Sequence, residues 1–195
     1  MLRLVTSGST QAQAEAERSD DALVADFRGG DQGGFAALYD RYRGPIYRFL
    51  LRQLPEAAAQ DLFQETWMKI LRALQTSTYQ AQGVFEAYLF RTAHNLLMDH
   101  FRREARRPVQ SGLEVEQLSQ DLEDELSQEQ LRERLYEEVA KLPVEQRSVW
   151  LIKQESALDM QAIADITSTS LEGVKSRLRY ANEKLKAGMQ RHVRS

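Results

Sequence analysis

Cysteine is absent from the 195-residue sequence, and this absence excludes several kinds of chemistry. Without cysteine there is no disulfide framework, no thiol nucleophile and no thiolate metal site. No run of residues approaches the roughly 18 apolar residues that a membrane-spanning helix needs, and residues 1–20 contain no apolar core of signal-peptide length. We therefore expect a soluble, cytoplasmic protein without membrane insertion.

Residues that break helices are also scarce, with ten glycines and four prolines. Hydrophobic residues make up 42% of the chain, which is enough for packed cores. Apolar side chains recur at helical spacing, while no alternating strand pattern extends beyond a few residues. The sequence therefore predicts an all-α fold.

No set of residues typical of catalysis or metal binding is present. His94 and His100 are six positions apart and fall on different faces of a helix. Asp61 and Glu65 have the spacing of a carboxylate metal site, but no matching Glu-x-x-His follows. The paired glycines of residues 29–34 lack the Lys-Ser/Thr of a phosphate-binding loop. We expect no enzyme activity, no cofactor and no metal; a metal-dependent helical enzyme, the alternative, would take up metal tightly.

Charge is segregated along the chain although its net value is only −3. Residues 114–138 carry ten acidic side chains against two arginines, whereas residues 172–195 carry seven basic side chains against two glutamates. A second basic cluster lies at residues 102–107. Two basic regions thus flank an acidic connector. This layout suits a nucleic-acid partner better than the net charge of the whole chain suggests.

Composition divides the chain into four parts. Residues 1–20 are rich in Ser, Thr, Gln and Ala and are expected to form a disordered arm. Residues 21–107 are predicted to be a helical domain, and residues 108–126 a flexible acidic linker. Residues 127–195 are predicted to be a second helical domain that begins with a capping box at Ser127.

Within the first domain, Gly29-Gly30 and Gly33-Gly34 are expected to interrupt the early helices. Asp61 is expected to open a helix with a buried apolar face and an exposed ridge. A further helix is expected over residues 85–103, where Arg91, Asn95, Asp99, Arg102 and Arg103 accompany four aromatic residues. Cations beside aromatic rings suit single-stranded nucleic acid, although most aromatics at helical spacing belong to a core.

Residues 163–179 predict a helix-turn-helix. A short helix ends near Ile166, a polar break follows, and Ser170 can N-cap a second helix with its hydroxyl. In that helix one apolar stripe faces inward, and the outward side chains can meet the major groove of DNA. The stripe comprises Val174, Leu178, Ala181 and Leu185; the outward set comprises Glu172, Lys175, Ser176 and Arg179. An ordinary surface helix would explain the charges alone, but not their combination with the turn.

Both halves together resemble a sigma-70-family transcription initiation factor of the extracytoplasmic-function (ECF) class. In the first half, residues 35–42, 61–67 and 88–103 look like successive pieces of the sigma-2 domain. In the second, the pieces that look like sigma-4 are Leu142-Pro143, Gln146-Arg147, Ile163-Ala164 and residues 174–178. The resemblance covers nearly everything from Asp26 to Leu185, and the order and spacing of the pieces make it specific.

The resemblance implies a role for each exposed surface. Core RNA polymerase would bind the ridge Asp61, Gln64, Glu65 and Met68. The single-stranded −10 promoter element would meet Tyr79, in the loop after this helix, and Arg91, Asn95, Asp99, Arg102 and Arg103. The duplex −35 element would meet Ser170, Glu172, Lys175, Ser176, Arg177 and Arg179. The acidic linker would enter a basic channel of the polymerase, and an anti-sigma factor is a candidate partner.

Three departures from the family pattern affect promoter recognition. Tyr88 stands where a Trp is usual, and Ser168 replaces a common turn Gly. Glu172-Gly173 replaces a usual Gly-Thr, which adds an acid beside the DNA; Glu172 can accept a hydrogen bond from a cytosine amino group. The sequence thus predicts a sigma factor that performs no covalent chemistry. The alternative is a stand-alone helix-turn-helix regulator whose N-terminal domain senses a ligand or dimerises.

Overall fold

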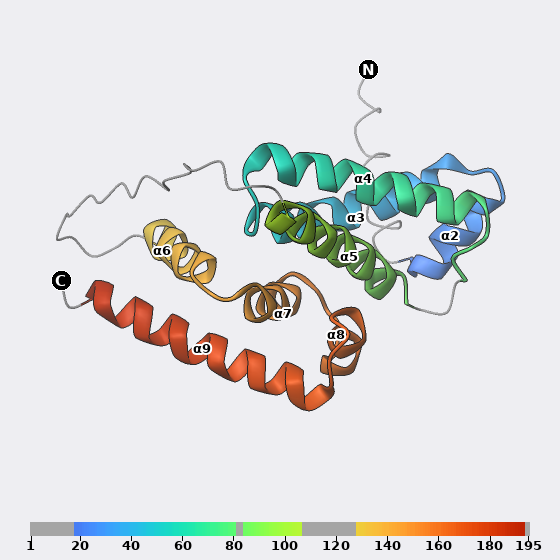
Figure 1. Ribbon diagram of the computed structural model, residues 1–195. Helices are drawn as coiled ribbons and strands as arrows, with labels where there is room; N and C mark the ends of the chain where they lie inside the picture. The colour runs from blue at the N-terminus through green and yellow to red at the C-terminus, as the bar shows by residue number, and fades with distance from the viewer. Residues whose placement is uncertain (1–17, 81–83, 107–127, 194–195) are drawn as a thin grey trace, which may run out of the picture.

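The computed structural model describes residues 18–80, 84–106 and 128–193, and within these ranges the chain is helical without a strand (Figure 1). The all-α prediction is therefore confirmed. The predicted linker and nearly all of the predicted N-terminal arm lie outside the described residues, as does Ser127. The helices are α2 (Asp20–Arg28), α3 (Gln32–Leu51), α4 (Glu56–Gln75), α5 (Phe85–Arg106), α6 (Gln128–Ala140), α7 (Val144–Glu155), α8 (Met160–Ile166) and α9 (Leu171–Val193).

Helices α2 to α5 pack around one aromatic and aliphatic core. Its largest fully buried side chains include Phe49, Phe85 and Phe90, and the rings of Phe49 and Phe90 meet edge to face with centroids 5.7 Å apart. Burying such rings contributes a few kcal/mol each. In α4 the predicted inner face is buried at Leu62, Trp67 and Ile70, which leaves the opposite face of this helix free for other contacts.

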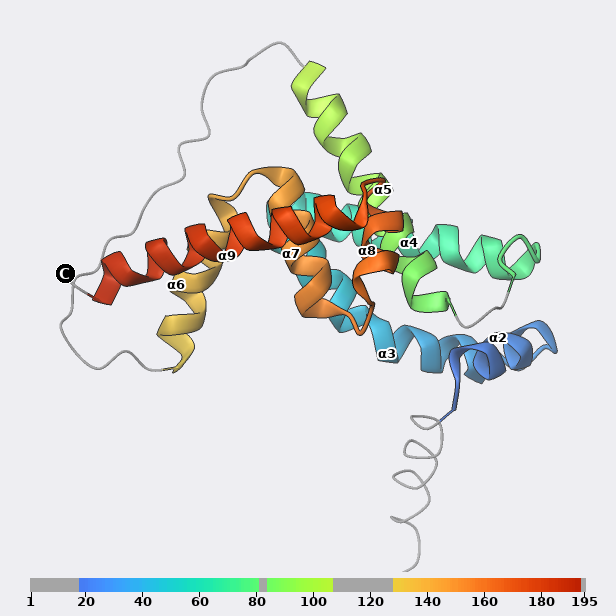
Figure 2. The ribbon, with the colours of Figure 1, turned by 90° about the horizontal axis from the view of Figure 1, so that it is seen from below.

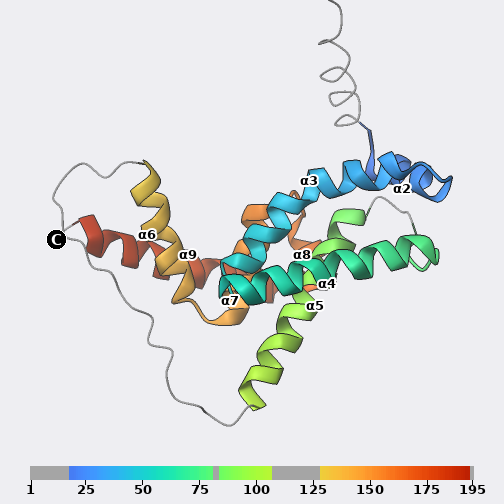
Figure 3. The ribbon, with the colours of Figure 1, turned by 90° about the horizontal axis from the view of Figure 1, so that it is seen from above.

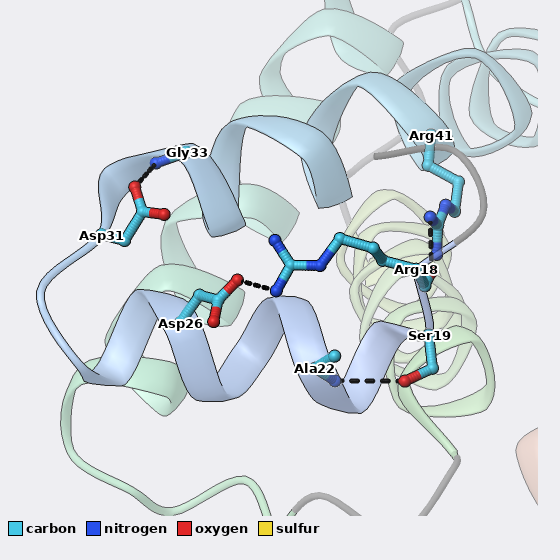
Figure 4. A network of polar contacts seen from close by, with 7 residues as sticks. All are labelled: Arg18, Ser19, Ala22, Asp26, Asp31, Gly33 and Arg41. Atoms are coloured by element: carbon cyan, nitrogen blue, oxygen red, sulfur yellow. Dashed lines mark hydrogen bonds and ion pairs between the residues drawn. The ribbon is translucent and has the colours of Figure 1, made fainter. Parts of the chain in front are cut away.

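Polar contacts fix the start of α2 (Figure 4). The Ser19 hydroxyl accepts a hydrogen bond from the Ala22 N–H at 3.3 Å, so Ser19 is the N-cap of the helix. The Arg18 side chain pairs with Asp26 of α2. The Arg18 carbonyl oxygen accepts a hydrogen bond from Arg41 of α3 at 2.8 Å. These contacts tie the beginning of the described chain to α3.

The corner between α2 and α3 depends on glycine. Gly30 has φ +99°, a left-handed conformation that glycine adopts without strain. Asp31 then caps α3 by accepting from the Gly33 N–H at 2.8 Å (Figure 4). A Cβ on Gly34 would lie 2.3 Å from the Leu23 carbonyl oxygen, so this glycine permits the close approach of the two helices.

One predicted break and one predicted boundary are wrong. Gly33-Gly34 does not interrupt a helix, because α3 begins at Gln32 and includes both residues. Helix α3 also continues through Pro45 to Leu51. Ile46, Phe49 and Leu50 beyond the proline are fully buried, and this packing offsets the backbone hydrogen bond that Pro45 cannot donate. Helix α4 begins at Glu56, after Pro55, rather than at Asp61, since the three alanines of residues 57–59 are strong helix formers.

One side chain joins α2 to the end of α4. The Arg28 guanidinium donates to the Leu74 carbonyl at 3.3 Å and to the Tyr79 carbonyl. Leu74 lies in the last turn of α4, and Tyr79 in the turn that follows it. Arg28 thus holds the C-terminal turn of α4 and the chain that follows it, about fifty positions later in the sequence.

Helices α6 to α9 form the second half, in which the long helix α9 packs on each of the other three (Figure 1). Val149, Leu151 and Ile152 of α7 are fully buried. The Trp150 indole N–H donates to the Asn182 side-chain oxygen of α9 at 3.1 Å. The predicted apolar stripe of α9 is confirmed, with Val174, Ala181 and Leu185 buried and Leu178 partly buried.

The two halves lie in direct contact: α3 packs on α7, and α5 packs on α8. In all three ribbon views α7 and α8 lie beside the first four helices, whereas the C-terminal end of α5 extends away from them (Figures 2 and 3). Sequence patterns did not indicate this docking. None of the described helices is both long and apolar enough to cross a membrane.

Candidate nucleic-acid interface

Local capping builds the helix-turn-helix that the sequence predicted. Asp159 caps α8 by accepting from the Ala162 N–H at 2.8 Å, and Ser170 caps α9 by accepting from the Gly173 N–H at 3.0 Å. Between the helices Ser168 has φ 50°, the left-handed conformation of a turn. Because glycine adopts this conformation most readily, the turn explains why a glycine is usual at this position.

The N-terminal half of α9 presents polar side chains to solvent. Glu172, Lys175 and Arg179 are exposed, while Ser176 and Arg177 are half-buried. Lys175 donates to the Glu172 carboxylate at 2.7 Å, so acid and base form an ion pair three positions apart. This face carries several hydrogen-bond donors and one carboxylate acceptor, which is the chemistry that reads base edges in the major groove.

The outer face of α5 carries the second predicted set. Arg91, Asn95 and Asp99 are exposed, and so are Arg102 and Arg103 near the C-terminal end of the helix. Arg102 pairs with Asp99, and its hydrogen bond lowers the pKa of the Asp99 carboxyl below its ordinary value. The carboxylate is therefore ionised and holds the guanidinium in place. The predicted inner stripe of α5 is buried at Leu89, Ala93, Leu96 and Leu97 and half-buried at Phe101.

Tyr79 occupies a different environment from the one that its predicted role requires. Its side chain is 3% exposed, and its ring packs 5.7 Å from the ring of Phe85 and 5.1 Å from that of Tyr88. A ring buried in this way is not free to stack on a DNA base. The structure assigns Tyr79 to the packing of the turn after α4, because the aromatic N-terminal turn of α5 covers it.

The ridge on α4 lies on the exposed face of the helix, where the sequence predicted it. Asp61, Gln64, Glu65 and Met68 all lie on the outer face, and Met68 is 52% exposed, the most exposed large apolar side chain in the described residues. Lys69 pairs with Glu65 at 3.4 Å. An exposed methionine surrounded by polar side chains fits a protein-binding surface, in which an apolar centre has a polar rim.

Sequence reasoning missed the polar groups between the halves. Gln53 and Ser148 are both buried, although they are 95 positions apart, and His94 of α5 is 7% exposed. Burial and, to a smaller extent, the charge of Arg177 together lower the pKa of His94 to about 4. A polar residue within an apolar helix face was the available sign of such a buried group. Helical periodicity, however, does not identify its hydrogen-bond partner.

The described residues do not form a metal centre. No group of three or more His, Asp or Glu side chains there has the geometry to hold an ion. Two surface hollows are open: one lies beside Tyr39, Arg43 and Tyr47, and the other between Glu138 and Arg191. The exposed helix faces therefore form the candidate site.

Comparisons with known proteins point to one family. The family model described as sigma-70 region 2 matches residues 38–107, which comprise most of α3, all of α4 and all of α5. The ECF RNA polymerase sigma factor BldN of Streptomyces coelicolor is 29% identical over 162 residues, which cover 81% of this chain and 61% of BldN. The ECF RNA polymerase sigma-E factor of Escherichia coli K12 is 26% identical over 188 residues, covering 90% of this chain and 97% of that protein.

Two solved structures share the fold. CnrH in complex with the cytosolic domain of CnrY has a TM-score of 0.61 at 23% identity and covers 87% of this chain and 96% of CnrH. The sigma factor RpoE of Bartonella quintana, solved with the anti-sigma factor NepR, has a TM-score of 0.63 at 18% identity, covering 80% of this chain and 96% of RpoE. Residues 38–107 thus match sigma-70 region 2, and over nearly its whole length the chain is similar to RNA polymerase sigma factors of the ECF class.

Proposed function

We propose that the protein binds core RNA polymerase through α4, traps the single-stranded −10 element on α5, and reads the duplex −35 element with α9. The observation that carries this proposal is the exposure of all three predicted faces at once. Each face belongs to a different helix whose opposite side is buried. In this role the factor positions an enzyme made of other chains in the cytoplasm and performs no covalent chemistry itself.

Core polymerase binding is assigned to Asp61, Gln64, Glu65 and Met68. An interface gains most from an apolar anchor surrounded by polar groups that exclude water. Met68 is that anchor, and the carboxylates and the amide beside it select a basic or amide-rich partner surface. Lys69 is paired with Glu65 and limits the negative charge of the ridge.

Single-strand binding is assigned to Arg91, Asn95, Arg102 and Arg103, with Asp99 as a positioning residue. A carboxylate repels phosphate, so Asp99 acts through Arg102, which it orients by their ion pair. The cations attract the DNA backbone, and Asn95 can hydrogen-bond to the edge of an unstacked base. Tyr79 is left out of this set because it is buried.

Reading of the −35 element is assigned to Ser170, Glu172, Lys175, Ser176, Arg177 and Arg179. Lys175 and Arg179 are exposed donors on the same side of α9. Glu172 holds Lys175 in its ion pair and can accept from a cytosine amino group, so the pair is a specificity element. Arg177 is half-buried, unlike Lys175 and Arg179, and its charge acts on His94 of α5.

A run-off transcription assay with purified core enzyme tests the proposal. We expect promoter-directed transcripts only when both factor and core are present, and weak specific DNA binding by the factor alone. A K175A/R179A variant should lose promoter selection, whereas Lys186→Ala, an exposed lysine two turns further along α9, serves as the matched control. Tight operator binding without polymerase, and no stimulation of core on any genomic template, would favour the stand-alone regulator instead.

An inhibitory protein partner forms part of the proposal. The RpoE structure contains an anti-sigma factor, and a protein that covers the faces of α4 and α5 would block both polymerase and DNA. Affinity purification of the full chain from native cells, followed by mass spectrometry, tests this point. Repeated recovery with core polymerase subunits alone would remove the inhibitor from the proposal.

A further inference from the structure

An aromatic ring lies in solvent on α9, the recognition helix of the helix-turn-helix. Tyr180 is 48% exposed, whereas every other aromatic side chain in the described part of the chain is buried or half-buried. Its neighbours Ala181 and Leu185 pack inward and are buried. A ring left in water gains little from the hydrophobic effect, so packing does not explain why α9 carries a tyrosine here.

The Tyr180 ring contacts a cation of the same helix. The Arg179 guanidinium lies over the ring, with Cζ 4.9 Å from the ring centroid. A cation within about 6 Å of a ring centroid is attracted to the negative face of the ring. A planar guanidinium that stacks through its face keeps the N–H donors at its edge free. Within the described ranges, Arg179 has no ion pair or hydrogen bond that would occupy these donors.

The turn before Arg179 holds its cation in another way. Lys175 donates to the Glu172 carboxylate at 2.7 Å, and Arg177 is half-buried. Over residues 171–182, Arg179 is therefore the one exposed cation whose donors are all available. The guanine edge in the major groove offers two acceptors, O6 and N7, which fit two parallel donors of a guanidinium. The chemistry of this position thus favours guanine.

Holding the guanidinium in place matters because an exposed arginine is otherwise free to move. Such a side chain samples many rotamers, and a bidentate contact with one base selects a single one of them. The loss of this freedom opposes binding. A guanidinium that already lies over Tyr180 has lost part of its freedom before DNA arrives, so its contact with the base is more favourable.

We propose that Tyr180 is a positioning residue, which holds Arg179 in place to read a guanine of the −35 element. The inference rests on the proposed function and adds to it the base that α9 prefers. In this role Tyr180 acts only through Arg179 and touches no base itself. The rival role is direct, since an exposed ring can also contact the methyl group of a thymine. The two roles predict different effects of substitution.

Selection from a duplex DNA library measures the base preference at each position. The library randomises both promoter elements, and the holoenzyme of the full chain with purified core selects from it. We expect the wild type to enrich one guanine that Arg179→Ala enriches about tenfold less or weaker still. Arg179→Lys keeps the charge but not the donor fork, and should lose most of this preference. Tyr180→Ala should lower the preference for the same guanine about two- to fivefold, the usual strength of an exposed cation–π contact.

Tyr180→Phe is the matched control, because it keeps the ring and removes only the hydroxyl; it should retain the wild-type preference. Gln190→Ala, at an exposed position about 30 Å along α9 from Ser170, should also leave the preference unchanged. R179A/Y180A should lose no more than R179A alone, because Tyr180 then has no cation to hold. An unchanged preference in Y180A, a loss at a different base pair, or additive losses in the double variant would overturn the inference.

Nuclear magnetic resonance of the free factor separates this inference from the proposed function. The ring current of Tyr180 should shift the Arg179 Nε–H signal, and the shift should persist in Tyr180→Phe and disappear in Tyr180→Ala. If the shift is present but the wild-type holoenzyme enriches no upstream base, the proposed −35 role fails and the stack stands only as a property of the free helix. If the holoenzyme enriches the guanine but the wild type shows no shift, Tyr180 does not position Arg179, and the inference alone is refuted.

Discussion

The Ser170 hydroxyl accepts a hydrogen bond from the backbone N–H of Gly173 at 3.0 Å, at the start of the recognition helix. Replacing Ser170 by Ala removes this cap, and we expect the free energy of unfolding to fall by about 1 kcal/mol. Urea denaturation followed by circular dichroism measures the change. Ser170→Asn keeps an acceptor and should stay near wild type; equal losses in both variants would contradict the capping role.

Ser168 is a second position at which the turn decides stability. With φ 50° it adopts a conformation that costs an L-residue about 1 kcal/mol or more, whereas glycine adopts it freely. Part of this gain is offset by the greater entropy of glycine in the unfolded chain. We expect Ser168→Gly to raise the free energy of unfolding by about 0.5 kcal/mol. Thermal unfolding would show a higher Tm, and a lower Tm would refute the prediction.

Substitutions at Tyr79 can distinguish a packing role of its ring from a role in stacking on a DNA base. Burial raises the pKa of its phenol to about 12, and the hydroxyl has no hydrogen-bond partner among the described residues. Tyr79→Phe should therefore keep or slightly increase stability and leave run-off transcription unchanged. Tyr79→Ala should cost about 3 kcal/mol through the cavity that it leaves. A stable alanine variant that fails only in promoter opening would instead return Tyr79 to the DNA-binding set.

His94 gives the stability a specific pH dependence. Its ordinary pKa is 6.5, and burial lowers the pKa to about 4, so the folded state binds fewer protons than the unfolded state between these values. Stability is therefore complete above about pH 6.5 and is lost as the pH falls towards 4, by roughly 3 kcal/mol in all. Urea unfolding at pH 7.5 and 4.5 should show a smaller loss for His94→Gln. Equal losses in both proteins would exclude His94 as the source.

Met68 tests the polymerase-binding ridge. It is 52% exposed, so Met68→Ala should leave the free energy of unfolding within about 0.5 kcal/mol of wild type. If Met68 anchors core polymerase, the same change should weaken binding about tenfold or more. Leu131→Ala, at another exposed apolar residue in α6, is the control and should bind core normally. Parallel weakening by both variants would argue against a specific anchor.

Local patterns were sufficient to predict much of this fold. The inner stripes of α4, α5 and α9 follow from helical periodicity, and Ser170 was identifiable as a cap because its hydroxyl precedes an apolar repeat. The inclusion of Gly33-Gly34 in α3 was missed because Gly34 permits the close approach of α2 and α3, a tertiary requirement that local helix preference does not show.

Long-range contacts were beyond periodicity. Nothing in one sequence pairs Gln53 with Ser148 or Arg48 with Glu155, since a pattern shows which face is buried but not what buries it. The same limit explains Tyr79, which stands in a polar stretch typical of an exposed loop. Its burial depends on the aromatic start of α5, to which no local spacing connects it.

The reach of Arg28 across the first half has a consequence for protein engineering. Its guanidinium donates to carbonyls at Leu74 and Tyr79, which ties the turn before α5 to α2. A chimaera that grafts this turn from another sigma factor, to change which promoters are opened, would separate the acceptors from their donor unless α2 travels with it. The transplantable module is therefore larger than the turn itself, and its junctions belong before α2 and after the turn.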